Sequence, residues 1–533
     1  MNDKKNLTIK DVFALAVQNH KKNNFIIAEK FYREVLNVDP DHFGSIFLLG
    51  TLSIQIKKLD SAKELLQKAI QIRPDHAEAH YNLGIAFDAL REFKNAISCY
   101  KQAIKIYPDH VQAYNNLGIS LKELGEYKEA IIFYQKAIQI KPDFAKAQYN
   151  LGNSLQELGE LQKAISCYEK AIKIDQNFSN AYLNLGNSLK ETGESQKAID
   201  NYKKVLELEP DSIEAQGNIS HIYISQLDNL KEAISSSYKA LKIYHKTFKF
   251  INQRISLYRL KHDVQQSEYL ISKNYNISGI DTFQKIGRDI LQRKENRDNY
   301  NQRILLNYDE INSLLPFYKA KHLYEILKAP KNCINPNKNW KDVEELYLNS
   351  SKQIIYIDNF LSDEAIKELR TFCLLSRIWN KEYKDKYLGA YSDKGFISPI
   401  HFQIAVDLKQ KLPKLFGQHK LGKFWAFKYD TTLGKGINIH ADFAIHNLNF
   451  WITPDKYNNG KDMGGLKVYD APAPDNWTFQ QYNKKTDEIY KFLKDNNANC
   501  TNVPYKYNRA VLFNSAYFHE TDKINFEDTY EGR

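Results

Sequence analysis

The chain has 533 residues, more than a single hydrophobic core usually supports, so several domains are expected. Hydrophobic residues make up 43% and charged residues 26% of it, which excludes a disordered protein, and no run of about 18 apolar residues predicts a membrane-spanning helix. The net charge of +11 comes from lysines interleaved with acids along the chain, which indicates solvated helix faces rather than a nucleic-acid surface.

The N-terminal tail, residues 1–8, lacks the apolar core of a secretory signal. The five cysteines are scattered and include no CxxC pair, which favours reduced thiols over a disulfide framework or a zinc site. Both observations predict a cytoplasmic protein.

Residues 9–247 repeat with a period of 34 residues, visible in four registers. Prolines that end the second helix of a repeat stand at Pro40, Pro74, Pro108, Pro142 and Pro210. Small residues that allow close helix packing stand at Gly50, Gly84, Gly118, Gly152 and Gly186, and at Ala28, Ala62, Ala96, Ala130, Ala164 and Ala198. Tyrosines expected to fill the space between the helices stand at Tyr32, Tyr100, Tyr134, Tyr168 and Tyr202.

This pattern resembles the tetratricopeptide repeat family. Five near-perfect copies cover residues 43–212, with a weaker copy at 9–42 and a degenerate seventh at 213–247. The resemblance implies an all-α solenoid whose concave groove holds a protein or peptide. Neither a nucleic acid nor a membrane is expected as a partner.

An asparagine register accompanies the packing positions. It comprises Asn82, Asn116, Asn150, Asn184 and Asn218, near the start of the first helix in five of the repeats. Helix propensity does not explain asparagine there, whereas an amide both donates and accepts and can pair with any peptide backbone. The register resembles the peptide-gripping ladder of O-linked N-acetylglucosamine transferases. The alternative is that these amides only join neighbouring helices.

Between residues 248 and 350 the period is lost, although apolar residues keep a helical spacing at Ile255, Leu257 and Leu260. We expect a helical segment that caps the apolar end of the last repeat and links the repeats to residues 351–533. His262 beside Asp263 is expected to be a surface pair.

Residues 351–533 change in character. IIYIDNFLSDEAIKEL predicts a strand followed by a helix with Ser362 as its N-cap. Four short β-rich runs come after it, namely KFWAFKY, NLNFWI, GGLKVY and NRAVLFN. Several short strands without intervening helices favour a sandwich or jelly roll over a parallel sheet.

GINIHADF places His440 and Asp442 two residues apart, so in an extended chain both side chains point to the same side. His519 comes after a later apolar strand. Two histidines and one carboxylate form the facial triad that binds Fe(II) and leaves positions open. His446, His401 and His419 have no such partners in the sequence, and His446 is expected to be structural or to face a substrate.

These motifs resemble the Fe(II)/2-oxoglutarate-dependent oxygenase superfamily, in its prolyl-hydroxylase-like branch. The resemblance covers residues 351–533 and implies a double-stranded β-helix (jelly-roll) domain. It implies His440, Asp442 and His519 as iron ligands, Fe(II) as cofactor, and 2-oxoglutarate and O₂ as cosubstrates. The carboxylate Asp442, absent from halogenating members, implies hydroxylation coupled to decarboxylation of 2-oxoglutarate to succinate.

The resemblance also implies Tyr429 and a basic residue as ligands of 2-oxoglutarate. Arg533 offers a bidentate guanidinium, fourteen residues after His519 where the family usually has about ten. Either Arg533 is this clamp, or the clamp and the final strand lie beyond a truncated C-terminus; Lys523 is a weaker candidate.

The sequence therefore predicts a multidomain protein with a tail (1–8), a solenoid (9–247), a helical segment (248–350) and an oxygenase-like domain (351–533). The predicted function is hydroxylation of a protein or peptide held by the solenoid. The alternative is a protein-binding scaffold whose oxygenase-like domain is inactive.

Overall fold

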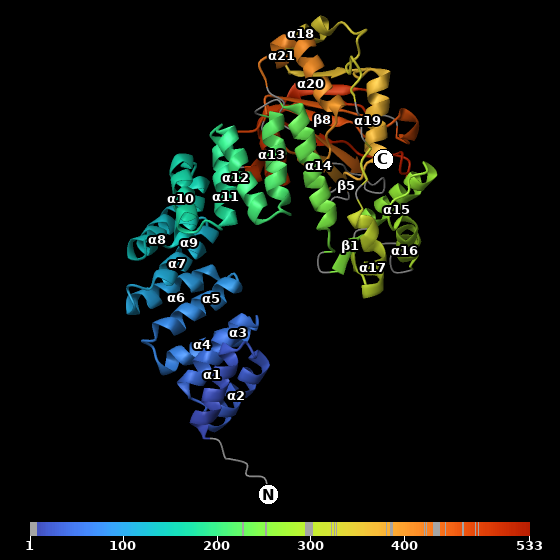
Figure 1. The fold of residues 1–533 in the computed structure, drawn as a ribbon. Coiled ribbons are helices and arrows are strands. Elements are labelled where there is room, and N and C mark those ends of the chain that lie inside the picture. Colours follow the sequence, from blue (N-terminus) through green and yellow to red (C-terminus); the bar gives the residue numbers. More distant parts are fainter. Residues whose placement is uncertain are drawn as a thin grey trace. The chain divides into compact units, whose positions relative to one another are not determined.

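The structure is a computed structural model of the chain (Figure 1). It describes residues 8–225, 229–250, 253–293, 302–320, 322–324, 326, 328–379, 381–383, 387–419, 422, 424–429, 437–442, 444–460, 463–474, 476–477 and 479–532. The chain divides into two compact units, Met1–Leu208 and Glu209–Arg533.

The N-terminal unit is a series of antiparallel helix pairs, two helices to each 34-residue repeat (Figure 1). The pairs are α1 (Ile9–Lys21) with α2 (Phe25–Val38), α3 (Phe43–Gln55) with α4 (Leu59–Ile72), α5 (Ala77–Ala89) with α6 (Phe93–Ile106), α7 (Val111–Glu123) with α8 (Tyr127–Ile140), α9 (Ala145–Glu157) with α10 (Leu161–Ile174), and α11 (Ser179–Glu191) with α12 (Ser195–Leu208). The predicted helical repeats are confirmed.

The repeated glycines and tyrosines set the distance between the two helices of a pair. Tyr134 of α8 is fully buried, and its ring lies against Gly118 of α7. A Cβ atom on Gly118 would stand 2.6 Å from the Tyr134 ring, so a larger residue does not fit. The same contact joins Gly84 to Tyr100, Gly152 to Tyr168 and Gly186 to Tyr202.

The C-terminal unit begins with the last helix pair, α13 (Ile213–Ser225) and α14 (Leu230–Lys246). This pair packs on the short helix η3 (Ser392–Lys394) and on α20 (Pro399–Lys411). The seventh repeat of the sequence is therefore built into the same compact unit as residues 351–532.

The middle segment contains α15 (Leu257–Ser272), α16 (Ile280–Gln292), α17 (Tyr308–Lys319) and α18 (Trp340–Leu348), with a small sheet of β1 (Arg254–Ser256) and β2 (Arg303–Leu305). α15, α16 and α17 share a core around Phe283 and Phe317, whose rings stack 4.1 Å apart. Within this unit α17 contacts α14 and α15 contacts α19 (Asp363–Leu375), so the segment joins the last helix pair to the sheet region.

The expectation that His262 and Asp263 form a surface pair is wrong. Both side chains are buried, because Asp263 is the centre of a polar network inside the unit. It accepts hydrogen bonds from Arg259 (2.6 Å) and Tyr318 (2.7 Å), and His262 lies 3.0 Å from its second oxygen. A buried carboxylate of this kind needs such partners, and Arg259 also donates to the carbonyl of Trp379.

The remaining strands form three small antiparallel sheets. Their orders are β3 (Ile354–Ile357), β10 (Ala510–Asn514), β7 (His446–Phe450); β11 (Tyr517–Thr521), β8 (Leu466–Pro472), β9 (Cys500–Val503); and β4 (Lys381–Glu382), β5 (Tyr387–Tyr391), β6 (Trp425–Tyr429). The strands predicted from IIYI and from the four β-rich runs are confirmed, as is Ser362 as the N-cap of α19. The smaller helices are α21 (Pro413–Phe416), α22 (Phe479–Lys484), α23 (Thr486–Asp495) and η5 (Asp455–Tyr457).

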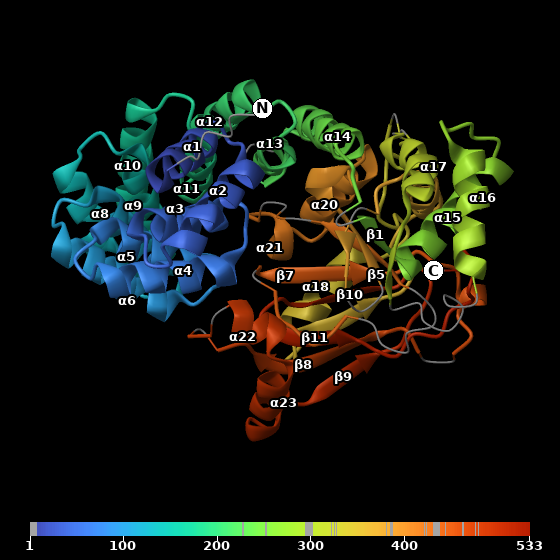
Figure 2. The same cartoon turned by 90° about the horizontal axis from the view of Figure 1, so that it is seen from below.

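Strand β10 lies between two layers (Figure 2). Ala510 and Leu512 point into the core formed with α19 and α20. Val511 and Phe513 point to the other side and pack on Leu466, Val468 and Val503 of β8 and β9. The sheet β3-β10-β7 therefore faces the sheet β11-β8-β9 across an apolar layer.

No helix in the described part of the chain is both long and apolar enough to cross a bilayer. All five cysteines belong to the described residues and have free thiols.

Candidate metal centre

Two backbone segments hold the predicted metal ligands. His440 and His519 form an isolated antiparallel bridge, with hydrogen bonds of 3.0 Å and 2.8 Å between their main chains. The bridge is continued by the bonds from Asp442 N to Ser515 O and from Thr521 N to Ile437 O. Residues 437–442 thus lie alongside β11, and ligands that are 77 positions apart in sequence become neighbours.

His440, Asp442 and His519 form a cluster able to hold one metal ion. One ligand atom of each lies within 4.8 Å of the others. Nε2 of His519 lies 3.4 Å from one Asp442 oxygen, and Nε2 of His440 lies 4.0 Å from the other. The imidazole rings are 4.3 Å apart. His440 and Asp442 point to the same side, as their spacing of two residues predicts.

The second ring nitrogens show that this cluster suits a metal. Nδ1 of His440 lies 2.8 Å from the carbonyl of Asn438, and Nδ1 of His519 lies 3.1 Å from the carbonyl of Tyr517. A carbonyl oxygen only accepts, so each Nδ1 donates its proton to the carbonyl and each Nε2 is the ring atom left to bind a metal. Both Nε2 atoms are on the side of the Asp442 carboxylate. Metal-bound histidines usually have this tautomer and a hydrogen-bond acceptor at the second ring nitrogen.

The electrostatics keep the ligands in their metal-binding forms. Burial, together with the neighbouring His519 imidazole, lowers the pKa of His440 to about 4, so the ring is neutral at pH 7. Burial alone would raise the pKa of Asp442, but the neighbouring His519 and His440 side chains and the amide of Asn447 lower it to about 2, so the carboxyl group is ionised at pH 7. Asn447 of β7 donates to Asp442 and fixes its orientation.

A pocket of about 950 Å³ opens over the cluster. Its walls come from α13, α19, α20, β6, β7, β8 and β11. The lining is largely aromatic and aliphatic, with Phe424, Trp425, Phe427 and Phe450 among its members. Polar groups that converge in a cavity with apolar walls are typical of a small-molecule or active site.

Of the residues predicted to bind 2-oxoglutarate, Tyr429 and Lys523 belong to the described part of the chain and Arg533 does not. Tyr429 lines the pocket beside the cluster, and its hydroxyl lies 3.3 Å from Oγ1 of Thr521. Burial raises the pKa of Tyr429, so the phenol stays protonated and can donate. Arg533 lies outside the described residues. Lys523 is exposed and does not line the pocket, whereas Arg370, Lys409 and Lys428 do.

Four further histidines line the same pocket without joining the cluster, namely His221, His401, His419 and His446. Nδ1 of His446 lies 3.2 Å from the Tyr347 hydroxyl, and the His446 and His419 rings are 5.8 Å apart. His401 is buried, with its ring stacked 4.7 Å from Phe424 and Nδ1 2.9 Å from the Ser398 hydroxyl.

Sequence reasoning did not find Asn447, Thr521 or the pocket cations. Asn447 lies five residues after Asp442, and nothing in its local pattern separates it from other strand asparagines. Arg370 lies on α19, and only the folding of that helix against the sheets brings it to the pocket wall.

The asparagine register makes contacts inside the solenoid. Asn82 donates to Thr51 (3.1 Å), Asn150 to Asn115 (2.9 Å) and Asn184 to Asn153 (2.8 Å), each on the preceding repeat. Asn116 likewise donates to Tyr81 at 3.3 Å. The donor half of these amides is therefore used between repeats, as in the alternative interpretation, and binding of a peptide by the register stays a prediction.

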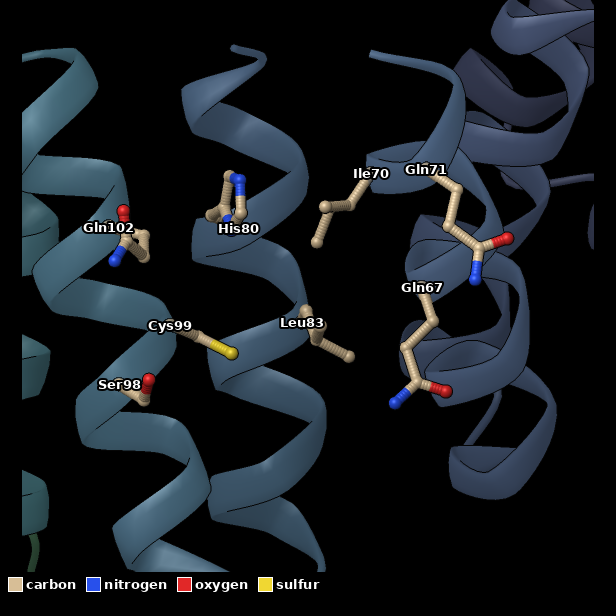
Figure 3. A pocket seen from close by; sticks show the side chains of 8 residues that line it. All are labelled: Gln67, Ile70, Gln71, His80, Leu83, Ser98, Cys99 and Gln102. Atoms are coloured by element: carbon tan, nitrogen blue, oxygen red, sulfur yellow. The ribbon is translucent and has the colours of Figure 1, made fainter. Parts of the chain in front are cut away.

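A second, smaller hollow of about 460 Å³ lies between two repeats of the N-terminal unit (Figure 3). It is lined by Gln67, Ile70 and Gln71 of α4, His80 and Leu83 of α5, and Ser98, Cys99 and Gln102 of α6. Burial raises the pKa of the Cys99 thiol to about 11, so it is protonated at neutral pH. None of the predicted site residues lies there.

The helical repeats match known protein families. Models described as tetratricopeptide repeat match residues 77–110, 99–132, 145–178, 179–212 and 213–246, and a model described as TPR repeat matches 53–91 and 120–159. Residues 53–246 form a tetratricopeptide repeat solenoid. Such repeats are protein-binding modules. No curated protein matches the chain.

Several solved structures are similar to this solenoid. MamA is 30% identical over 30% of this chain and 95% of its own, with a TM-score of 0.30. YrrB, described as a TPR protein with an unusual peptide-binding site, is 20% identical over 34% and 95%, with a TM-score of 0.31. PilF of Pseudomonas aeruginosa is 22% identical over 39% and 93%, with a TM-score of 0.35.

Proposed function

We propose that this chain is an Fe(II)- and 2-oxoglutarate-dependent oxygenase that hydroxylates a protein or peptide bound by its tetratricopeptide repeats. The observation that carries the proposal is the cluster of His440, Asp442 and His519, which lie within 4.8 Å of one another in the lining of a large pocket. Two imidazoles and one carboxylate are the ligands of non-haem Fe(II) oxygenases.

The surrounding fold supports the same proposal. Two antiparallel sheets face each other across Val511 and Phe513, an arrangement that a double-stranded β-helix domain requires. The ligands lie on segments paired with each other at one edge of these sheets. We therefore propose the jelly-roll fold for this domain.

The residues of the pocket have separate tasks in this reaction. When bound, Fe(II) with 2-oxoglutarate and O₂ supplies the oxidising power, so that one oxygen atom enters a substrate C–H bond and the other enters succinate as CO₂ leaves. Tyr429 and Thr521 offer hydroxyls to a cosubstrate carboxylate, and Arg370 and Lys428 lower the cost of bringing negative charge into the pocket. The apolar walls exclude water.

The test is turnover of 2-oxoglutarate to succinate by the full chain with added Fe(II). Wild type is expected to turn over 2-oxoglutarate, and His440→Ala is expected to lose both turnover and metal binding. His446→Ala is a matched control, because it removes a pocket histidine outside the cluster. Absence of turnover by wild-type protein that binds the metal would contradict the proposed activity.

The second candidate function is a protein-binding scaffold without catalysis. It is favoured by the family matches, all of which lie within residues 53–246. A wild-type protein that binds a polypeptide but neither metal nor 2-oxoglutarate would establish it.

A further inference from the structure

Helix α13 belongs both to the last tetratricopeptide repeat and to the wall of the metal pocket. The repeat match at 213–246 includes all of α13. Two of its residues, His221 and Ser225, line the pocket that also contains His440, Asp442 and His519. A helix from a polypeptide-binding repeat therefore forms one side of the candidate active site.

One face of α13 carries a polar stripe, and two of its three residues line the pocket. Asn218, His221 and Ser225 are separated by three and four residues, so they lie on one face of the helix. All three are partly exposed, whereas Ile219, Ser220, Ile222 and Ile224 between them are buried. Asn218 is also the fifth member of the asparagine register, so the register position and the pocket wall share this face.

Specific contacts fix α13 and its partner α14 against the sheet region. The buried Ser237 hydroxyl of α14 donates to the carbonyl of Ser392 and accepts from the N–H of Gly395, both at 2.7 Å. Ile224 of α13 packs with Ile397 and Phe402 of the sheet region in one apolar cluster. A docked helix with satisfied polar groups can hold its pocket residues in place.

The pocket that this polar stripe reaches also has uncovered apolar surface. Ile445 is 57% exposed and Trp425 is 36% exposed, and both line the pocket. The volume of about 950 Å³ is at the upper end of the roughly 300–1,000 Å³ typical of small-molecule sites, more than a five-carbon dicarboxylate needs. The excess space, which has both polar and apolar lining residues, suits a peptide backbone and its side chain.

We propose that the substrate of this site is an extended polypeptide segment that lies along α13, with His221 and Ser225 contacting its backbone and Trp425 and Ile445 contacting its side chains. From Asn218 to Ser225 the helix rises about 10 Å, the length of about three extended residues. The Ser225 hydroxyl donates to the carbonyl of His221, so its oxygen faces the substrate as an acceptor for a peptide N–H. This inference rests on the proposed oxygenase function and specifies its substrate.

The test uses the full chain with Mn(II) as a probe of the metal centre and a displayed library of random linear peptides. Peptides selected on wild type are expected to show Mn(II)-enhanced nuclear relaxation when bound, since they lie beside the cluster. Ser225→Trp fills the stripe and is expected to weaken peptide binding at least about tenfold, with Mn(II) affinity unchanged. His221→Ala, which only removes atoms, is expected to weaken it by a smaller factor.

Lys239→Trp is the matched control, because it adds the same side chain to an exposed position of α14 outside the pocket. A library that yields no binder, peptides that Mn(II) does not relax, or equal peptide affinity of wild type and both stripe variants would overturn the inference. If Mn(II) still binds and 2-oxoglutarate still turns over in those cases, the proposed function survives. Failure of wild type to bind Mn(II) would overturn both.

Discussion

At the scale of single residues, the orientation of the ligands depends on neighbours that do not touch the metal. Asn447 donates to Asp442, and the carbonyls of Asn438 and Tyr517 set the tautomers of the two histidines. We expect Asn447→Leu to weaken metal binding by about 10–100-fold, because an isosteric apolar side chain leaves the Asp442 carboxylate unoriented. Titration with Mn(II) measures the effect.

The control for this prediction is Asn449→Leu, which changes the next residue on the same face of β7 without touching Asp442 in the described structure. Metal affinity should stay near the wild-type value in this control. An equal loss in both variants would show that the strand, and not the hydrogen bond to Asp442, is responsible.

His401 predicts a pH dependence of stability. Burial lowers its pKa from 6.5 to about 3, so the folded protein resists protonation of this ring while the unfolded chain accepts a proton. The unfolded state therefore binds more protons below pH 6.5, and the stability due to the neutral ring is lost as the pH falls towards about 3. At about pH 5 the loss from one such histidine is about 2 kcal/mol.

His401→Phe keeps an aromatic ring against Phe424 and removes this titration. The difference in free energy of unfolding between variant and wild type, measured with urea, should shift in favour of the variant by about 2 kcal/mol between about pH 7.5 and pH 5. The other buried histidines contribute equally to the free energy of unfolding of both proteins, so their contributions cancel in this difference. A difference that does not change with pH would contradict the assignment.

The sequence predicts part of the site at this scale. The spacing of His440 and Asp442 is local, and a strand period of two is enough to place both on one side. Asn447, Thr521 and Arg370 reach the pocket only through the packing of sheets and α19, which no local pattern encodes. Arg533 is outside the described residues, so its role as the clamp stays a prediction.

At the scale of elements, the repeats depend on the fit of a glycine against a tyrosine. We expect Gly118→Ala to lower the free energy of unfolding of the solenoid, because overpacking against Tyr134 costs about 1–3 kcal/mol. The better helix propensity of alanine offsets roughly 1 kcal/mol of this cost. Thermal unfolding followed by circular dichroism measures the effect, with Lys122→Ala at a partly exposed position of the same helix as control.

A double-mutant cycle with Tyr134→Leu tests the cause. A smaller side chain at position 134 leaves room for the new methyl group, so the two changes together should cost less than the sum of the single changes. Additive costs would mean that the methyl group does not meet the tyrosine ring.

The docking of α14 makes a second prediction about elements. Ser237→Ala leaves the carbonyl of Ser392 and the N–H of Gly395 without their partner in a buried place, at a cost of about 1–3 kcal/mol. Hydrogen exchange over α13 and α14 should become faster, while Ser235→Ala, a partly exposed neighbour, should leave it unchanged. Equal exchange in both variants would contradict the role of Ser237.

Helices and strands were predictable because each has a period that the sequence repeats locally. Strand pairing was not, because β10 joins β3 and β7 across long stretches of chain. The failure at His262 and Asp263 has a similar origin: a charged pair looks exposed until Arg259 and Tyr318 are placed around it.

At the scale of the whole molecule, one of the two compact units contains the entire candidate metal centre. All three cluster residues and every residue that lines their pocket lie within Glu209–Arg533. We expect this fragment alone to bind Mn(II) as tightly as the full chain. A fragment that starts at residue 248 should bind it more weakly, because it lacks α13 and α14. Equal affinities of the two fragments would contradict a structural role for the last helix pair.

The fusion of the last helix pair with the sheet region has an evolutionary consequence. Because each repeat contacts only its neighbours, whole 34-residue units can be gained or lost ahead of α13 without disturbing the residues around the metal cluster. Duplication or deletion of such units would alter how far along a partner the solenoid reaches, while the chemistry stays the same. Related chains are therefore expected to differ in repeat number far more than in the sequence from α13 onward.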